Sequence, residues 1–264
     1  YIERDVHDLT QVGDQGKFLK FMTVLAACTG RLLNLASVAR DVNISPPTAE
    51  RWLSILQTSQ IVYLLRPYHN NLIKRAVKTP KIYFMDTGLA AYLTKWNTPE
   101  VMQNGAMAGP FFETFVIAEI IKSYLNRGKD APIYFYRDKD MNEIDLLIQH
   151  DHTLCPIEIK KHADPDKKDI SAFRVLDRIP GADRGPGGVV CMYDNLITLK
   201  DEDKVIPVKY FRAGVPPARG RKGALRLRPP ENVRPLAAEN SRPEDLVAGE
   251  FATFCDACLA GNDP

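Results

Sequence analysis

Apolar residues recur at helical spacing through the first part of the chain. Over residues 17–29 they mark one face of a helix that should be buried. A second helix is expected after Asn34 and a third after Ser45, because both residue types can cap a helix N-terminus. The third helix has a proline in its first turn, where proline is tolerated. The pattern therefore predicts a helix-turn-helix arrangement.

Two short runs rich in β-branched and aromatic residues follow, at residues 61–65 and 81–85. Such runs on either side of a polar stretch are typical of a β-hairpin. Helices followed by a hairpin with a basic connection describe a winged helix, which we expect over residues 1–90. Residues 91–108 contain turn residues and indicate a linker.

A different pattern, in which helices and strands alternate, begins at Gly109 and predicts a separate α/β domain over residues 109–211. A helix at about residues 110–126 comes first. Strands are predicted at residues 133–136, 143–149, 154–160, 188–193 and 206–211, with a helix at 166–179. The last strand is expected at a sheet edge. This order predicts a central mixed sheet.

The end of the chain differs in kind from the rest. Residues 212–264 hold seven of the nineteen prolines, and their basic residues are arginines apart from Lys222. No periodic apolar pattern there is long enough to build a core. We therefore predict a Pro/Arg-rich tail that is mostly disordered, with a short helix near residues 243–254.

Charged residues interrupt two of the predicted apolar strands. Strand alternation places Asp145 on the face opposite Ile144, Leu146 and Ile148, and places Glu158 and Lys160 together on one face. A short turn joins the two strands, so they should pair and bring Asp145, Glu158 and Lys160 to one side of the sheet. Carboxylate oxygens on a rigid sheet suit Mg²⁺ or Mn²⁺. A lysine beside such a metal can orient water or stabilise charge on a phosphate during phosphodiester hydrolysis.

Simpler alternatives remain for each of these residues. Glu158 and Lys160 could form an ordinary surface ion pair, since such pairs are common. On the preceding helix, Glu119 falls near the middle of the apolar face and Glu113 at its border. A buried carboxylate needs a cation, either a lysine or a metal, so both glutamates are candidates. The alternative is that either is a surface residue.

At these residues the chain resembles the PD-(D/E)XK, or restriction-endonuclease-like, nuclease superfamily. In that superfamily the helix glutamate often follows a glycine by four residues, as Glu113 follows Gly109, which favours Glu113 over Glu119. The resemblance implies a restriction-endonuclease-like α/β domain. It further implies metal binding by Glu113, Asp145 and Glu158, with Lys160 assisting the attacking water.

Several sequence motifs resemble the domain of unknown function 4143 (DUF4143) family. They are Tyr1–Val6, Thr29–Asn34, Lys78–Leu89 and Phe112–Val116. That family occupies the C-terminal part of prokaryotic AAA+ ATPases, so the resemblance implies an ATPase domain as the natural partner. The sequence has no Gly-x-x-x-x-Gly-Lys-Ser/Thr loop and therefore no ATP site of that type.

The expected winged helix raises the question of DNA binding. Thr48, Arg51 and Ser54 would face DNA from the third helix, and Lys74, Arg75 and Lys78 would contact phosphates. A winged helix in an ATPase can instead dock another protein. The net charge of +2 and the outward-facing Glu50 argue against DNA binding, so both interpretations stay open.

Composition limits the environment rather than the activity. No apolar run approaches the roughly 20 residues that cross a membrane, and the odd number of cysteines, five, is unlike a disulfide framework. A reducing cytoplasm is the simpler expectation. Cys255 and Cys258 form a lone CxxC pair, which does not indicate zinc. The oligomeric state is not predicted.

Two functions follow from these observations. The first is the DNA-binding and nuclease-like portion of an AAA+ ATPase, with Mg²⁺-dependent hydrolysis of DNA. The second is a non-catalytic effector module of such an ATPase that binds DNA or protein. If Asp145 and Glu158 lie close enough to share one cation, the first is favoured; on opposite faces of the sheet they could not do so.

Overall fold

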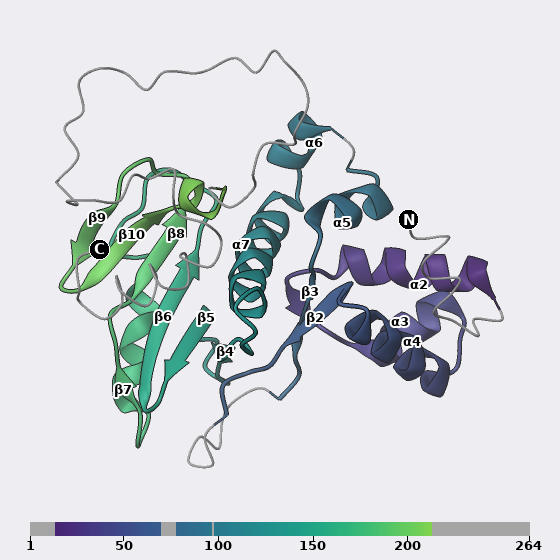
Figure 1. Cartoon of the computed structure of the whole chain (residues 1–264), viewed down its shortest axis with the longest axis horizontal. Coiled ribbons are helices and arrows are strands. Elements are labelled where there is room, and N and C mark those ends of the chain that lie inside the picture. The colour runs from purple at the N-terminus through teal and green to yellow at the C-terminus, as the bar shows by residue number, and fades with distance from the viewer. Residues whose placement is uncertain (1–13, 70–77, 97, 213–264) are drawn as a thin grey trace.

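Three capped helices open the part of the chain that the structure, a computed structural model, describes: residues 14–69, 78–96 and 98–212. They are α2 (Gln15–Ala27), α3 (Leu35–Val42) and α4 (Pro46–Thr58). The predicted caps are confirmed, because Asn34 accepts a hydrogen bond from the Ser37 amide and Ser45 one from the Thr48 amide. Apolar residues of all three helices meet in one core, shown at the right of Figure 1.

A three-stranded antiparallel sheet lies against these helices. Its order is β1 (Arg31–Leu32), β3 (Lys81–Phe84) and β2 (Val62–Leu65), so the predicted hairpin strands are confirmed and β1 is added. Gly30 makes the turn into β1 at a φ of 75°, a conformation that favours glycine, and its amide donates to the Ile82 carbonyl. The two-residue β1 is too short to leave an alternating pattern in the sequence.

The residues expected to form a linker hold regular structure. Helix α5 (Thr87–Thr94) ends there, and α6 (Pro99–Asn104) lies wholly within it. Trp96, Met102 and Met107 pack in the same core as α2–α4. The Thr98 side chain caps α6 by accepting a hydrogen bond from the Val101 amide. The helix has only six residues, too few for a helical period to be recognised in the sequence.

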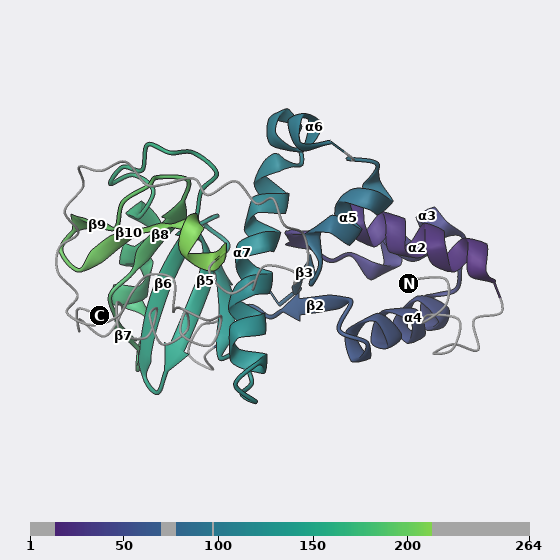
Figure 2. The same ribbon diagram turned by 45° about the horizontal axis from the view of Figure 1, so that its top comes forward.

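Helix α7 (Ala108–Leu125) is the central element, and both views place it between the N-terminal helices and the larger sheet (Figures 1 and 2). Its first turn contributes Phe111 to the N-terminal core, whereas Val116, Ile117 and Ile120 pack in the core under the larger sheet. The helix is therefore buried on more than the single apolar face that its sequence predicted.

The larger sheet has the order β4-β5-β6-β8-β10-β9, with β7 also paired to β6. Its strands are β4 (Ile133–Arg137), β5 (Glu143–His150), β6 (Thr153–Ile159), β7 (Asp183–Arg184), β8 (Gly188–Cys191), β9 (Ile197–Lys200) and β10 (Asp203–Pro207). Pairs β4–β5, β5–β6 and β9–β10 are antiparallel, whereas β6 pairs in parallel with β7 and β8, and β8 with β10. The predicted α/β class with a central mixed sheet is confirmed.

Two predicted elements need correction. The last strand is β10, which ends at Pro207 and lies inside the sheet because β9 pairs outside it; residues Val208–Arg212 form the 3-10 helix η2. The helix predicted at 166–179 is instead the shorter 3-10 helix η1 (Ser171–Arg178). Asp166 and Asp169 form a side-chain-stabilised turn before it, since the Asp166 amide donates to Asp169.

The two sheets are joined through backbone hydrogen bonds. Beyond β2, the Tyr68 amide donates to the Phe135 carbonyl at 2.7 Å, and the Phe135 amide donates to Arg66 at 3.1 Å. In the described ranges, no helix combines the length and apolarity needed to span a bilayer. The predicted tail at 212–264, apart from Arg212 at the end of η2, lies outside the described residues, as do Cys255 and Cys258.

Candidate functional site

An irregularity in β5 positions the first predicted site residue. Tyr134 pairs with Leu147 and Tyr136 with Ile144, so Asp145 and Leu146 together lie opposite Phe135 in a β-bulge. Ile144 consequently packs in the core beside η1, whereas Leu146 packs in the core beside α7. The prediction that these two residues share a face is wrong, because the bulge interrupts the alternation.

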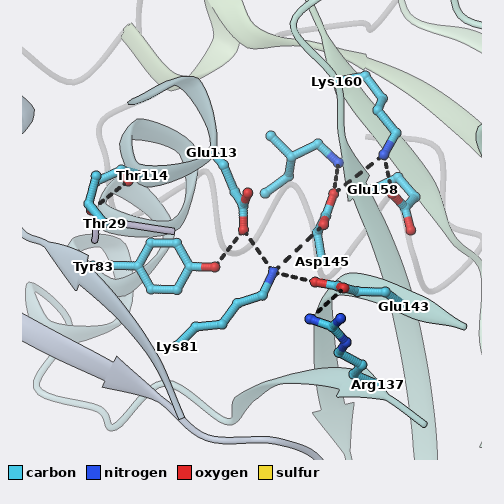
Figure 3. Close-up of polar contacts among 11 residues, drawn as sticks. Thr29, Lys81, Tyr83, Glu113, Thr114, Arg137, Glu143, Asp145, Glu158 and Lys160 are labelled. Carbon is cyan, nitrogen blue, oxygen red and sulfur yellow. Dashed lines mark hydrogen bonds and ion pairs between the residues drawn. The ribbon is translucent and has the colours of Figure 1, made fainter. Parts of the chain in front are cut away.

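Asp145 lies between two lysines. Its Oδ1 is 4.0 Å from Lys81 Nζ, and its Oδ2 is 3.8 Å from Lys160 Nζ (Figure 3). The Ile159 backbone amide also donates to Oδ2, at 3.0 Å. The bulge therefore gives Asp145 one partner on β3, Lys81, and two at the end of β6, the last strand residue Ile159 and Lys160 directly after it.

Glu158 and Asp145 both form ion pairs with the ammonium of Lys160. The Oε2 atom of Glu158 lies 2.7 Å from Lys160 Nζ, and the Glu158 side chain is only 5% exposed. Glu158 is in register with Val189, which packs in the core on the η1 side of the sheet. Burial, with the nearby Asp145, raises the pKa of Glu158 to about 9 against the opposing effect of Lys160. The predicted trio of Asp145, Glu158 and Lys160 is therefore brought together.

Lys81 is the most highly connected of the site residues that the sequence did not predict. Its ammonium lies 2.7 Å from Glu143, 3.1 Å from Glu113 and 4.0 Å from Asp145, with the side chain 5% exposed. Burial disfavours its charge, but the three carboxylates outweigh burial and raise its pKa above the usual value. Lys81 and Tyr83 are two residues apart on β3, so strand alternation puts them on one face; Glu158 and Lys160 have the same spacing at the end of β6, and that spacing was the available signal.

Glu113 is the helix residue that reaches this group. It receives a 2.5 Å hydrogen bond from the Tyr83 hydroxyl and a 3.1 Å bond from Lys81, both on Oε1. Burial and Asp145 raise the pKa of Glu113, while Lys81 and Tyr83 oppose the rise. Glu119 pairs instead with Lys122 on the same helix, at 2.8 Å.

The full group, here called the acid–lysine cluster, comprises Lys81, Tyr83, Glu113, Arg137, Glu143, Asp145, Glu158 and Lys160. Arg137 joins it through a 3.5 Å ion pair with Glu143. Its acids and lysines alternate in the order Glu113, Lys81, Asp145, Lys160 and Glu158 across the end of the sheet. Four carboxylates thus face three cationic side chains.

The cluster's oxygen donors are of the type that Mg²⁺ and Mn²⁺ prefer, and Asp145 and Glu158 both reach Lys160. Glu113 is separated from them, because Lys81 stands between it and Asp145. Over the described ranges, no three acidic, histidine or cysteine side chains converge as a metal-binding group. Asp145 and Glu158 could supply at most two carboxylates to one divalent cation, whereas Glu113 is bound to Lys81 and Tyr83.

The DNA-binding candidates lie elsewhere on the surface. Arg51 and Ser54 are exposed on α4, and Lys78 is exposed just before β3. Thr48 is half-buried, and its hydroxyl lies 2.8 Å from the Ser45 hydroxyl at the start of α4. Lys74 and Arg75 lie outside the described residues.

Comparison with known proteins divides the chain into two segments. Residues 1–100 match the domain of unknown function DUF8612, and residues 108–211 match the domain of unknown function DUF4143. The resemblance to DUF4143 is thus confirmed for the second segment, while the first matches a separate family model.

Two curated relatives are uncharacterized proteins of Mycobacterium bovis and Mycobacterium tuberculosis. Each is 26% identical over 217 residues, covering 78% of this chain and 48% of the relative. The chain therefore spans about half the length of the curated relatives it matches. No solved structure matches. Lys81 and Tyr83 lie in the segment matching DUF8612, and all four carboxylates of the cluster lie in the segment matching DUF4143.

Proposed function

We propose that the acid–lysine cluster is the active site of a Mg²⁺- or Mn²⁺-dependent nuclease of the PD-(D/E)XK type. The observation that carries the proposal is the meeting of Asp145 and Glu158, from paired strands, at the ammonium of Lys160. An Asp on one strand and an ExK sequence on the next is the pattern that the nuclease resemblance requires.

In this proposal the less exposed carboxylates bind the metal and the more exposed lysine contacts the substrate phosphate. Asp145, oriented by the Ile159 amide, and Glu158 would hold the cation, with Glu113 as a third ligand once it is freed from Lys81. Lys160 is 35% exposed and can reach a phosphate in solvent. A bound divalent cation would activate water and stabilise negative charge on the phosphate.

The test is cleavage of labelled linear and branched DNA by the full chain with Mg²⁺. Asp145→Ala removes a metal ligand and Lys160→Ala removes the nearby cation, so each should lower the cleavage rate by about 100-fold or more. Glu119→Ala, which removes a carboxylate of α7 that pairs with Lys122 instead of with the cluster, is the matched control and should leave the rate unchanged. Equal rates for Asp145→Ala, Lys160→Ala and the parent would remove this site from the reaction.

The N-terminal segment supports a DNA-targeting role within the same proposal. The order α2, β1, α3, α4, β2, β3 is compatible with a winged helix, in which α4 would enter the major groove. In this arrangement Arg51, Ser54 and Thr48 would face bases, and Lys74, Arg75 and Lys78 would contact phosphates. We place the whole module at the C-terminal end of a cytoplasmic AAA+ ATPase; the curated relatives extend beyond the match and are long enough to hold a further domain.

A non-catalytic effector module is the second candidate. It is favoured by Lys81, whose ammonium already lies against Glu113, Glu143 and Asp145 and neutralises part of their charge. An effector would bind DNA or a protein partner but would not cleave DNA, even with an ATPase partner supplied in trans. Metal-dependent cleavage that appears in the presence of that partner would exclude it.

A further inference from the structure

We propose that Lys81 is an internal cation that competes with the divalent metal for Glu113 and Asp145. The inference rests on the proposed function, and it assigns a regulatory role to a residue of the N-terminal segment. When Lys81 is in place, its ammonium occupies Glu113 and Asp145. When Lys81 withdraws, Glu113 becomes available to join Asp145 and Glu158.

The contacts of Lys81 support this assignment. The Lys81 ammonium lies 2.7 to 4.0 Å from one oxygen of each of three carboxylates. Lys81 belongs to β3, a strand whose residues are all buried. Phe135 covers it, with the ammonium 5.5 Å from the ring centroid. A cation thus already stands between Glu113 and Asp145, where a metal binding both acids would have to lie.

Like charges make the two occupants mutually exclusive. A divalent ion and an ammonium a few ångströms apart in a buried site repel strongly, because the low local dielectric screens them poorly. Glu113 adds a geometric constraint, since Tyr83 and Lys81 both bind its Oε1 and hold it on the β3 side. Lys160 differs, because it is part of the ExK pair and remains accessible to solvent.

The consequence is a link between metal binding and the position of β3. Lys81 and Tyr83 are on β3, which pairs with β1 and β2 and packs against α7. Anything that shifts β3 away from α7, such as a partner bound to the N-terminal helices, would release Glu113 and raise metal affinity. The site would then be completed only in the engaged protein.

The experiment measures Mn²⁺ binding to the full chain by the paramagnetic resonance signal of free Mn²⁺. Lys81→Met should bind Mn²⁺ about tenfold or more tightly than the parent, because Glu113, Glu143 and Asp145 lose the cation they share. Lys81→Arg, which keeps the charge, should bind as weakly as the parent. Lys122→Met removes the lysine that pairs with Glu119 on α7 and should change nothing. Mn²⁺ affinity in Lys81→Met equal to or below that of the parent overturns the proposal.

Two further measurements guard against a Lys81→Met chain that does not fold. Lys81→Met combined with Glu143→Gln removes the cation together with one acid it contacts, and should bind Mn²⁺ more tightly than Glu143→Gln alone. In the parent chain, saturating Mn²⁺ should speed hydrogen exchange of the amides at residues 81–84, and unchanged or slower exchange overturns the proposal.

Tighter Mn²⁺ binding by Lys81→Met, with no DNA cleavage by any variant, would support competition by Lys81 and refute the proposed nuclease. DNA cleavage by the parent, together with an unaltered Mn²⁺ affinity in Lys81→Met, would support the nuclease and refute competition by Lys81.

Discussion

Glu158 is a cluster residue whose burial makes its charged form costly to the folded protein. Burial and Asp145 raise its pKa to about 9, so the folded protein favours the protonated carboxyl more than the unfolded chain does. Its contribution to stability is fully present below the ordinary pKa, near 4.5, and is lost as pH rises toward 9. A carboxylate kept in such a place is more easily explained by function than by stability.

Replacement of Glu158 by glutamine tests this. Glutamine is neutral at every pH, so Glu158→Gln should raise the free energy of unfolding at pH 8 by about 1 kcal/mol or more. Near pH 4 the difference from the parent should shrink, because Glu158 is then protonated in both folded and unfolded chains. Urea unfolding at the two pH values measures both effects. A glutamine variant that is less stable at pH 8 would mean that the Lys160 contact outweighs the cost of burial.

At the scale of elements, a buried pair of threonines joins segments far apart in the sequence. Thr29, at the end of α2, lies 2.8 Å from Thr114 on α7 through their hydroxyls and accepts a hydrogen bond from the Phe84 amide on β3. Both threonines are fully buried. This contact holds α7 beside β3, and so keeps Glu113 within reach of Lys81 and Tyr83.

Thr29→Val keeps the shape but removes the hydroxyl, leaving the Phe84 amide and Thr114 without this partner. The free energy of unfolding should fall by about 1–3 kcal/mol, the cost of unpaired buried polar groups. Thr29→Val with Thr114→Val should cost less than the sum of the two single changes, because the second change removes an orphaned hydroxyl. Denaturant unfolding of the four proteins gives the comparison, and strict additivity would argue against coupling.

Sequence reasoning worked well for elements with strong local signals. The caps at Asn34 and Ser45 and the strands around Asp145 and Glu158 were all predictable from spacing and residue type. It failed at β1, at α6 and at the bulge in β5, because each spans too few residues to establish a period. The 3-10 helix η1 was misjudged because its apolar positions at 173 and 176 fit an α-helix equally well.

At the scale of the whole molecule, α7 makes the two matched segments share their cores. Phe111 packs with the N-terminal helices, while Tyr83 and Met85 of the N-terminal segment pack with Val116 and Ile117 beneath the larger sheet. The acid–lysine cluster lies at this junction and draws on both segments.

Shared cores predict cooperative unfolding. The described part of the chain should unfold in a single thermal transition whose calorimetric and van't Hoff enthalpies agree. Differential scanning calorimetry provides the measurement. Two well-separated transitions would show that residues 14–104 and 108–212 are stable independently, and would weaken the argument that β3 and α7 control one site together.

The sequence by itself determined the helices α2, α3, α4 and α7, most strands, the mixed α/β class and the pairing of the Asp145 strand with the strand that carries Glu158, since these depend on local periodicity and a short turn. Only the tertiary structure decided that Lys81 neutralises Glu113 and Asp145. Lys81 lies 32 residues before Glu113 in the chain, and no local pattern indicates which buried carboxylates will meet a lysine. That choice depends on how α7 packs against β3, which is a property of the folded cores.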